Sequence, residues 1–268
     1  MKKLFILIIL LGFGLFHEAH AAFSLVATST GINGSSQEVT STAIDTTGAD
    51  LIVVSASFNN SGEQTLCLIN DSLGNTWTSL NVGGNDGSNQ AAHRLYYAWN
   101  AIVGPNHTFA FNPTNGGSCG YPSIGVEAWK GSQTSADPFD VQNTSNTAVG
   151  ETVTNIGTNS VTPSVNNELL VTGIMAQNFT NPAITSNFNI SDYTPTTGNS
   201  YGHTMAYKIQ TTAGAENPKW SWTSSNLAAS SIATFKAAPA TVAANPTSTS
   251  SFLINGASVT INGLYVFQ

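Results

Sequence analysis

Charged side chains are scarce in this chain of 268 residues. It contains only 7 Lys and Arg and 14 Asp and Glu, so 8% of its residues are charged, whereas an ordinary globular domain has roughly a quarter. A helical bundle needs abundant Glu and Lys for its solvated faces, and this composition excludes one. Clustered Lys and Arg are also missing and the formal net charge is -7, so we expect no nucleic-acid partner.

Uncharged polar residues take the place of the charges. The chain has 30 Ser, 33 Thr and 28 Asn, about a third of its length. Its hydrophobic fraction of 41% is enough to build a core, which argues against disorder. No segment has apolar residues at a 3.6-residue period between capping signals. The composition predicts a β-rich domain whose polar faces carry hydroxyl and amide groups.

The first 21 residues have the features of a secretory signal peptide. Lys2 and Lys3 form a basic end, residues 4–16 are apolar, and Ala19-His20-Ala21 supplies a cleavage pattern. The apolar run is too short to cross a bilayer comfortably, and no second long apolar segment follows. We therefore predict a secreted, extracellular protein without a transmembrane segment in its mature chain. The cell surface and the periplasm are the alternatives.

Two cysteines, Cys67 and Cys119, are present in the mature chain. In an oxidising compartment an even number of cysteines is usually paired. Neither has the His neighbour that activates a reactive thiol. The sequence predicts a structural disulfide between them.

Strand-like segments recur along the chain. Residues 51–58 and 169–176 are short apolar runs, typical of strands that are buried on both faces. Residues 108–111 and 219–222 alternate large and small side chains, as half-buried strands do. Residues 71–75 resemble a hairpin turn. We predict an all-β, antiparallel fold.

The two halves of the chain contain similar segments in the same order. Residues 49–54, 93–97, 109–111 and 125–130 are followed, in this order, by their counterparts 167–172, 203–207, 220–222 and 231–236. This predicts pseudo-repeats over about 40–131 and 158–236. A shared core is more favourable than two small ones, so we expect one two-sheet β-sandwich, a jelly roll built from two Greek-key halves. The alternative is a loose alignment of two unrelated β-rich halves.

The predicted sandwich domain spans residues 22–236, and the composition changes after it. Residues 237–250 contain two prolines and no aromatic residue, which is typical of a linker. Residues 251–268 contain two Asn-Gly steps between apolar runs, which predicts a β-hairpin tail. A hairpin of this size is marginal alone. It should dock on the main domain or pair with a partner's sheet, giving a homo-oligomer.

Five motifs resemble those of secreted β-sandwich domains in bacterial and viral surface proteins, of jelly-roll or concanavalin-like type. They are Leu51–Val54, Asp71–Trp77, Tyr96–Asn100, Glu127–Gly131 and Asp137–Asp140. The resemblance covers residues 24–238, and its motifs are structural. It implies a sandwich with an adhesive, sugar-binding or packaging role, and it supplies no catalytic residue.

The acidic residues do not form a catalytic pattern. A retaining glycosidase needs two carboxyl groups about 5–5.5 Å apart, and no two acids lie at i and i+2 or i+4 on one strand-like segment. Glu127 is the only acid deep within such a segment, and we expect it to face solvent or to pair with Lys130 or Arg94. Serine-hydrolase and zinc-protease motifs are absent. We therefore predict a protein that is not an enzyme.

Metal binding has two candidate sets of residues. His93 and His203 occupy equivalent positions in the two halves, but a zinc site needs three or four ligands, so we expect them to bond to backbone groups. Asp45, Asp50, Asp137 and Asp140 offer the oxygen ligands that calcium prefers. Such residues are also common in turns. We predict no cofactor, with a structural calcium ion as the alternative.

Aromatic residues give the strongest indication of function, because sugar rings stack on exposed aromatic faces. Alternation along the strands predicts that most of the five tryptophans are buried. The tyrosines in Gly-, Pro- and Asn-rich loops are expected to be exposed. A glycan site would comprise Asn85, Asp86, Arg94, Tyr121, Tyr193 and Tyr201.

These observations predict a secreted, non-enzymatic binding or adhesion protein with carbohydrate, or another surface partner, as its ligand. One alternative is a self-assembling surface or matrix protein that uses its C-terminal strand. A polysaccharide hydrolase or lyase is the third hypothesis.

Overall fold

The computed structural model describes residues 22–33, 38–60, 67–84, 90–114, 119–147, 151–177, 179–196, 201–239, 250–254 and 257–261. Within these ranges the chain forms strands and turns but no helix, so the all-β prediction is confirmed. Every strand pair is antiparallel. The predicted signal peptide lies outside the described residues, as do Asn85 and Asp86. The described part of the chain has no helix long and apolar enough to span a membrane.

The first half of the chain forms two sheets. The larger has the order β1 (Ser24–Ile32), β8 (Gly120–Lys130), β3 (Leu51–Asn60), β6 (Gln90–Trp99) and β5 (Thr78–Gly84). The smaller has the order β2 (Val39–Thr40), β7 (Phe109–Pro113) and β4 (Cys67–Asp71).

The second half forms two sheets of the same kind. The larger consists of β9 (Phe139–Asn146), β16 (Ala228–Phe235), β11 (Glu168–Ala176), β14 (Gly202–Gln210) and β13 (Asn189–Thr194), and the smaller of β10 (Val153–Gly157), β15 (Lys219–Asn226) and β12 (Ala183–Ile184). Each strand order equals that of the first half with every strand number raised by eight. In the described residues each half thus has eight strands, where the sequence motifs had indicated four.

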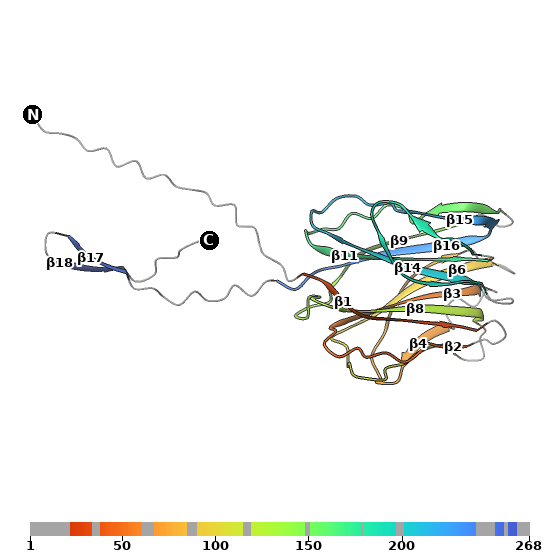
Figure 1. Ribbon diagram of the computed structural model, residues 1–268, viewed down its shortest axis with the longest axis horizontal. Helices are drawn as coiled ribbons and strands as arrows, with labels where there is room; N and C mark the ends of the chain where they lie inside the picture. The colour runs from red at the N-terminus through yellow and green to blue at the C-terminus, as the bar shows by residue number, and fades with distance from the viewer. Residues whose placement is uncertain are drawn as a thin grey trace, which may run out of the picture. The chain divides into compact units, whose positions relative to one another are not determined.

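The four sheets pack in layers, with the two five-stranded sheets in the middle (Figure 1). A central hydrophobic cluster joins those two sheets, and it includes Leu95 and Trp129 from one and Leu169 and Phe235 from the other. A second cluster lies between β2-β7-β4 and the first five-stranded sheet, and a third between β10-β15-β12 and the second. Residues 21–238 form one compact unit, called the main unit below.

The layered arrangement explains why β3 and β11 are apolar without alternation. Leu51 and Val53 belong to the central cluster, whereas Ile52 and Val54 on the opposite face pack beneath the smaller sheet. A strand covered on both faces buries consecutive residues, so its sequence is a continuous apolar run.

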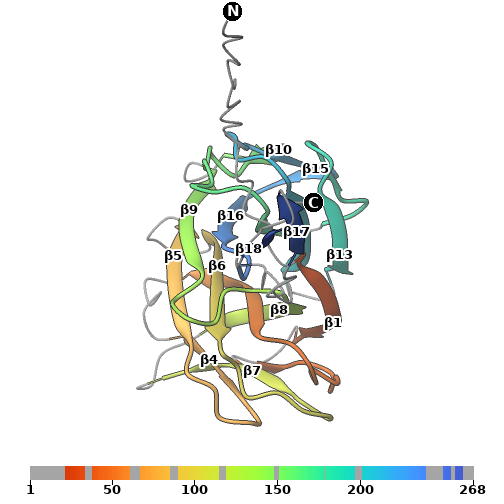
Figure 2. The same cartoon turned by 90° about the vertical axis from the view of Figure 1, so that its left-hand side faces the viewer.

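The edges of the two five-stranded sheets lie beside each other. Figure 2 shows β5 beside β9 on one side of the main unit and β1 beside β13 on the other. The amide of Asn81 in β5 donates to Oε1 of Gln142 in β9 over 2.7 Å. These contacts cover backbone groups that an open sheet edge would expose.

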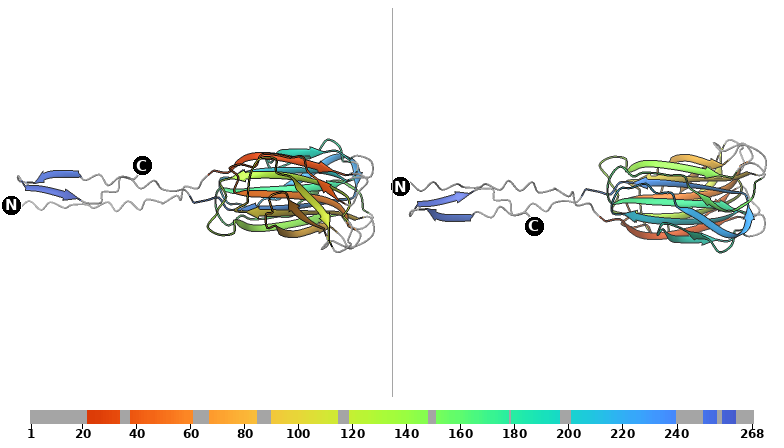
Figure 3. Two further views of the ribbon diagram at one scale, coloured as in Figure 1. Left: turned by 90° about the horizontal axis from the view of Figure 1, so that it is seen from below. Right: turned by 90° about the horizontal axis from the view of Figure 1, so that it is seen from above.

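The main unit has two distinct ends, between which its strands run (Figure 3). At one end, which we call the terminal end, Ser24 at the start of β1 pairs with Lys130, and the amide of Ala238 donates to the carbonyl oxygen of Gly131 over 2.8 Å. The chain therefore enters and leaves the main unit at the same place. At the opposite, distal end, Asn59 pairs with Gly120.

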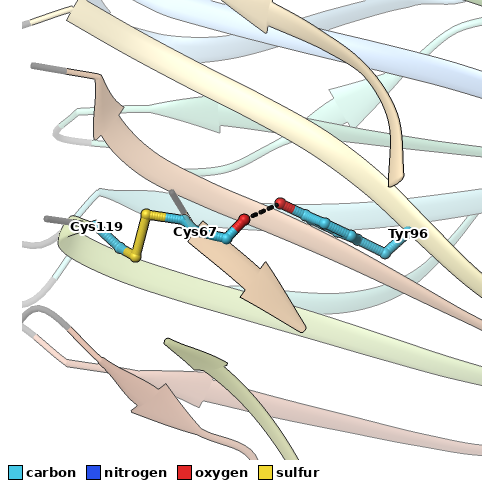
Figure 4. Close-up of a disulfide and its surroundings, with 3 residues drawn as sticks. All are labelled: Cys67, Tyr96 and Cys119. Carbon is cyan, nitrogen blue, oxygen red and sulfur yellow. Dashed lines mark hydrogen bonds between the residues drawn. A yellow bond between two sulfur atoms is a disulfide. The ribbon is translucent and has the colours of Figure 1, made fainter. Parts of the chain in front are cut away.

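The predicted disulfide between Cys67 and Cys119 is present and fully buried (Figure 4). It joins the first residue of β4 to the residue before β8, so it connects the smaller sheet to the larger one. The hydroxyl of Tyr96 donates a 2.9 Å hydrogen bond to the carbonyl oxygen of Cys67.

The C-terminal strands belong to a second unit. There β17 (Ser250–Ile254) pairs with β18 (Ala257–Ile261) as an antiparallel hairpin. Residues 240–249 of the predicted linker and 262–268 of the predicted tail lie outside the described residues.

Candidate functional site

A group of buried polar side chains lies between the two five-stranded sheets, beyond the central hydrophobic cluster. Strand alternation places it there: Leu51 and Val53 are followed on the same face of β3 by Ser55, and Leu95 of β6 is preceded on the same face by His93. We call Ser55, His93, Asp192, His203 and Ser231 the interface cluster.

The two histidines of the interface cluster meet at one hydroxyl group. Oγ of Ser55 lies 2.5 Å from Nε2 of His93 and 2.8 Å from Nε2 of His203. Nδ1 of His93 lies 3.0 Å from Oγ of Ser231, across the interface in β16. The two imidazole rings are nearly parallel, with an interplanar angle of 14° and centroids 6.3 Å apart.

Two glycines leave the space that this arrangement needs. A Cβ on Gly173 would lie 2.2 Å from Oγ of Ser55, and a Cβ on Gly125 would lie 2.4 Å from Cε1 of His203. Position 173 in β11 is the counterpart of position 55 in β3, and position 125 in β8 is the counterpart of Ser231 in β16. Each serine therefore has a glycine as its counterpart in the other half.

Asp192 lies at one end of the cluster. Its Oδ1 accepts a 2.6 Å hydrogen bond from the amide of Met205, and its Oδ2 lies 3.7 Å from Nδ1 of His203. The pairing of β13 with β14 shifts register between Ile190 and Asp192. Such a bulge changes the face to which a strand residue points, and the Asp192 side chain is only 5% exposed.

Glu127 lies beside the cluster, fully buried in β8. One carboxylate oxygen accepts a 3.0 Å hydrogen bond from Nε1 of Trp129, and the other accepts one from the hydroxyl of Ser191. The expectation that Glu127 faces solvent or pairs with Lys130 or Arg94 is wrong. Side chains along β8 alternate between its two faces, and Glu127 lies on the face of Trp129, which belongs to the central cluster. A substrate in solvent does not reach this fully buried carboxyl group.

Burial makes the charged forms of these groups unfavourable. Desolvation raises the pKa of Glu127 to about 7, and desolvation together with the nearby Glu127 raises the pKa of Asp192 to about 8. Desolvation lowers the pKa of His203 to about 3. It also lowers the pKa of His93 well below its usual value, with a further effect of His203. At neutral pH these shifts favour the protonated form of Asp192 and the neutral forms of both histidines.

The groups that the two histidines contact differ from those that we expected. We expected His93 and His203 to bond to backbone groups, but their ring nitrogens face serine hydroxyls and a carboxyl group. In the described ranges, no three His, Cys, Asp or Glu side chains are grouped so that they could hold a metal ion.

The four aspartates considered for calcium each bind groups of the protein. Asp45 accepts from the amide of Thr47, and Asp50 from the amides of Gly131 and Ser132. Asp137 accepts from the hydroxyl of Tyr97, and Asp140 pairs with Lys236. Asp45 thus bonds to a residue two positions along the chain, as turn residues do. Asp137 bonds to a residue of the neighbouring strand β6.

The residues predicted to bind a glycan separate into two groups. Tyr121 is 37% exposed and Tyr193 is 39% exposed, and both lie near the distal end. Tyr201 is buried, and its hydroxyl accepts a 2.8 Å hydrogen bond from Asn59, so its predicted exposure is wrong. Arg94 is also buried, 5.9 Å from the ring centre of Tyr96. Among the tryptophans, Trp129, Trp220 and Trp222 are buried, as predicted.

Comparisons of the chain with protein-family models, curated proteins and solved structures find no match. The resemblance to secreted surface domains therefore stays a prediction from sequence motifs. A functional conclusion has to rest on the geometry of the described residues.

Proposed function

We propose that the protein is an exported, non-enzymatic binding or adhesion module that presents its distal end to a carbohydrate ligand. The observation that carries this proposal is the position of the two chain ends. Residues 24 and 238 both adjoin residues 130–131 at the terminal end. A domain attached to a surface or to another unit from that side leaves its opposite end accessible.

The exposed tyrosines near the distal end supply the chemistry that sugars require. Tyrosine presents an apolar ring and a polar hydroxyl, and sugar rings stack on such faces. The hydroxyl of Tyr193 donates a 3.0 Å hydrogen bond to the carbonyl oxygen of Phe179, which orients its ring. Tyr121 has a φ of 52°, a backbone conformation that is unfavourable for a bulky residue. Such strain is frequent at binding sites.

The disulfide supports export, because buried disulfides persist mainly in oxidising compartments. In the proposed pathway residues 1–21 direct the chain out of the cytoplasm and are removed.

We interpret each half of the main unit as one jelly roll. In both halves the first strand pairs with the eighth, the second with the seventh and the third with the sixth, which is the pattern of a long hairpin rolled into two sheets. The molecule would then be two jelly-roll sandwiches packed through their larger sheets, rather than one sandwich shared by two Greek-key halves.

Replacing the distal tyrosines is expected to weaken glycan binding. Tyr121→Ala and Tyr193→Ala each remove one stacking face, and we expect a three- to tenfold loss of affinity from each, about 0.5–1.5 kcal/mol. A glycan array identifies the ligand, and affinity electrophoresis on that polysaccharide measures the loss. Ile102→Ala is the control, because it removes an exposed apolar side chain far from the distal end. Ile102 is 58% exposed, and it follows Ala101, which bonds to Asp50 at the terminal end. Absence of retardation by any glycan would contradict the proposal.

Self-assembly through the C-terminal hairpin is the second candidate function. It is favoured by the two-stranded β17-β18 sheet, which lies outside the main unit. A hairpin of this kind is marginally stable alone and has two unpaired edges, so it is suited to pair with another sheet.

Deleting residues 251–268 distinguishes the two functions. If the hairpin mediates assembly, sedimentation analysis should show concentration-dependent oligomers of the full mature chain and only monomers of the shortened chain. Glycan retardation should survive the deletion, because the proposed sugar-binding tyrosines lie in the main unit. Oligomers that persist after the deletion would exclude assembly through the tail.

A further inference from the structure

We infer that the hydrogen bonds of the interface cluster run in a direction that keeps a proton on Asp192, and that the stability of the main unit depends on this proton. The inference follows from counting donors and acceptors along the cluster. It concerns the stability of the main unit and does not rest on the proposed ligand.

The direction of the chain is set at Ser231. Its hydroxyl lies 3.3 Å from the carbonyl oxygen of His93, to which it donates, and 3.0 Å from Nδ1 of His93. Because a hydroxyl has one hydrogen, both contacts are hydrogen bonds only when its oxygen accepts from Nδ1–H, whereas donation to Nδ1 would leave the carbonyl oxygen without a hydrogen. A neutral His93 has no hydrogen left for Nε2, so Nε2 accepts from the hydroxyl of Ser55.

The hydrogen bonds keep this direction from Ser55 to Asp192. Since the Ser55 hydrogen is committed to His93, its oxygen accepts from Nε2–H of His203. A neutral His203 then presents a bare lone pair at Nδ1, facing Oδ2 of Asp192 at 3.7 Å. An ionised Oδ2 would repel this lone pair, whereas a protonated Asp192 brings no negative charge to it.

The opposite direction would require an ionised Asp192 that accepts from Nδ1–H of His203. A charge-assisted hydrogen bond of that kind is about 2.7–2.9 Å long, and the observed 3.7 Å is longer. In the described residues, neither Oδ2 of Asp192 nor Nδ1 of His203 has a hydrogen-bond partner. The ion pairs that lysines make lie elsewhere, between Lys208 and Glu216 and between Lys236 and Asp140. An anion at Asp192 would thus have the Met205 amide at Oδ1 but no donor or cation at Oδ2.

The surrounding strands present few titratable groups to Asp192. They are Glu127 from β8, His203 from β14 and, beyond Ser55, His93 from β6. The nearby positions of β3, β11 and β16 carry the uncharged Ser55, Gly173 and Ser231. Both oxygens of Glu127 accept hydrogen bonds, which suits its ionised form, so Glu127 should lose its proton before Asp192. The raised pKa of Asp192 agrees with this order.

The pH dependence follows from the difference between folded and unfolded states. A carboxyl group with a raised pKa keeps its proton on folding, so unfolding releases a proton and becomes more favourable as the pH rises. The two histidines have lowered pKa values and act in the opposite sense, but only below about pH 6.5, where they gain protons on unfolding. Above that pH the carboxyl groups determine how the stability changes with pH. Stability should be highest in mild acid and should decrease above neutral pH.

Nitrogen-15 NMR of the two histidines in the mature protein tests the assigned direction. At pH 6 to 7 we expect His93 to carry its hydrogen on Nδ1 and His203 on Nε2. The reversed pair of tautomers, or a doubly protonated His203, would mean an ionised Asp192 and would overturn the inference. This measurement needs no variant, so it decides even if substitutions prevent folding.

An Asp192→Asn variant tests the role of the proton in stability. Asparagine keeps the acceptor for the Met205 amide and offers an N–H group to His203. For the wild type we expect Asp192 and Glu127 together to raise the unfolding equilibrium constant about tenfold between pH 7 and pH 8, and we expect only the contribution of Glu127, about twofold, to remain in the variant. Asp140→Asn is the control, because Asp140 is ion-paired and has a lowered pKa, so the rise should persist. Equal rises in the wild type and Asp192→Asn would overturn the inference.

Discussion

Removing the disulfide with Cys67→Ala and Cys119→Ala is expected to lower the free energy of unfolding by about 4 kcal/mol. The bond closes a loop between residues 52 positions apart, and its loss releases that loop in the unfolded chain. For a domain of this size the change corresponds to a decrease of roughly 10 °C in Tm. Urea titration and thermal unfolding measure the two quantities.

A reducing agent supplies the matched control for this prediction. It should lower the stability of the wild type to that of the double variant and leave the double variant unchanged. Alanine is preferable to serine because both positions are fully buried, and a buried hydroxyl without a partner would add its own penalty. A loss below about 1 kcal/mol would show that the unfolded state gains little freedom when the bond is removed.

The fold class was predictable because it depends on local patterns, but the number of strands was not. The apolar run of β3 and the alternation of Lys219–Trp222 indicate strands without reference to any partner. By contrast, β2 and β12 have two residues each, and β9 consists mainly of polar residues. Strands of this kind acquire their structure from neighbours in the sheet. The eight strands of each half, and hence the four layers, were therefore not visible in the sequence.

The interface cluster was likewise only partly predictable from the sequence. Alternation along β6 puts His93 on the face of Leu95 and Tyr97, but no local pattern indicates that His203 approaches it from another sheet. Asp192 was missed because its sequence neighbourhood resembles a turn, and only the bulge in β13 directs it inward. Tyr201 was misjudged for the converse reason, because its burial depends on Asn59, which lies 142 residues away.

A methyl group added at position 173 is expected to have the next largest effect. In Gly173→Ala the new Cβ would lie 2.2 Å from Oγ of Ser55 and 2.5 Å from Nε2 of His93. Both atoms belong to buried, hydrogen-bonded side chains of the facing five-stranded sheet, so relief requires the two sheets to move apart. Overpacking of a core destabilises by about 1–3 kcal/mol, and we expect a value near the upper limit. Chemical denaturation measures it.

A second substitution tests whether the contact with Ser55 is the cause. Ser55→Gly removes the nearest atom, so the double variant should be less destabilised than the two single effects combined, by about 1 kcal/mol or more. Gly104→Ala is the control, because its new Cβ would meet only Leu73, at 3.8 Å, and we expect a change within about 0.5 kcal/mol. Strictly additive effects at positions 55 and 173 would contradict the close packing of the two halves at this serine. A measured coupling between positions 55 and 173 would instead show how the two similar halves pack face to face: where one half has a serine, the equivalent position of the other half has a glycine.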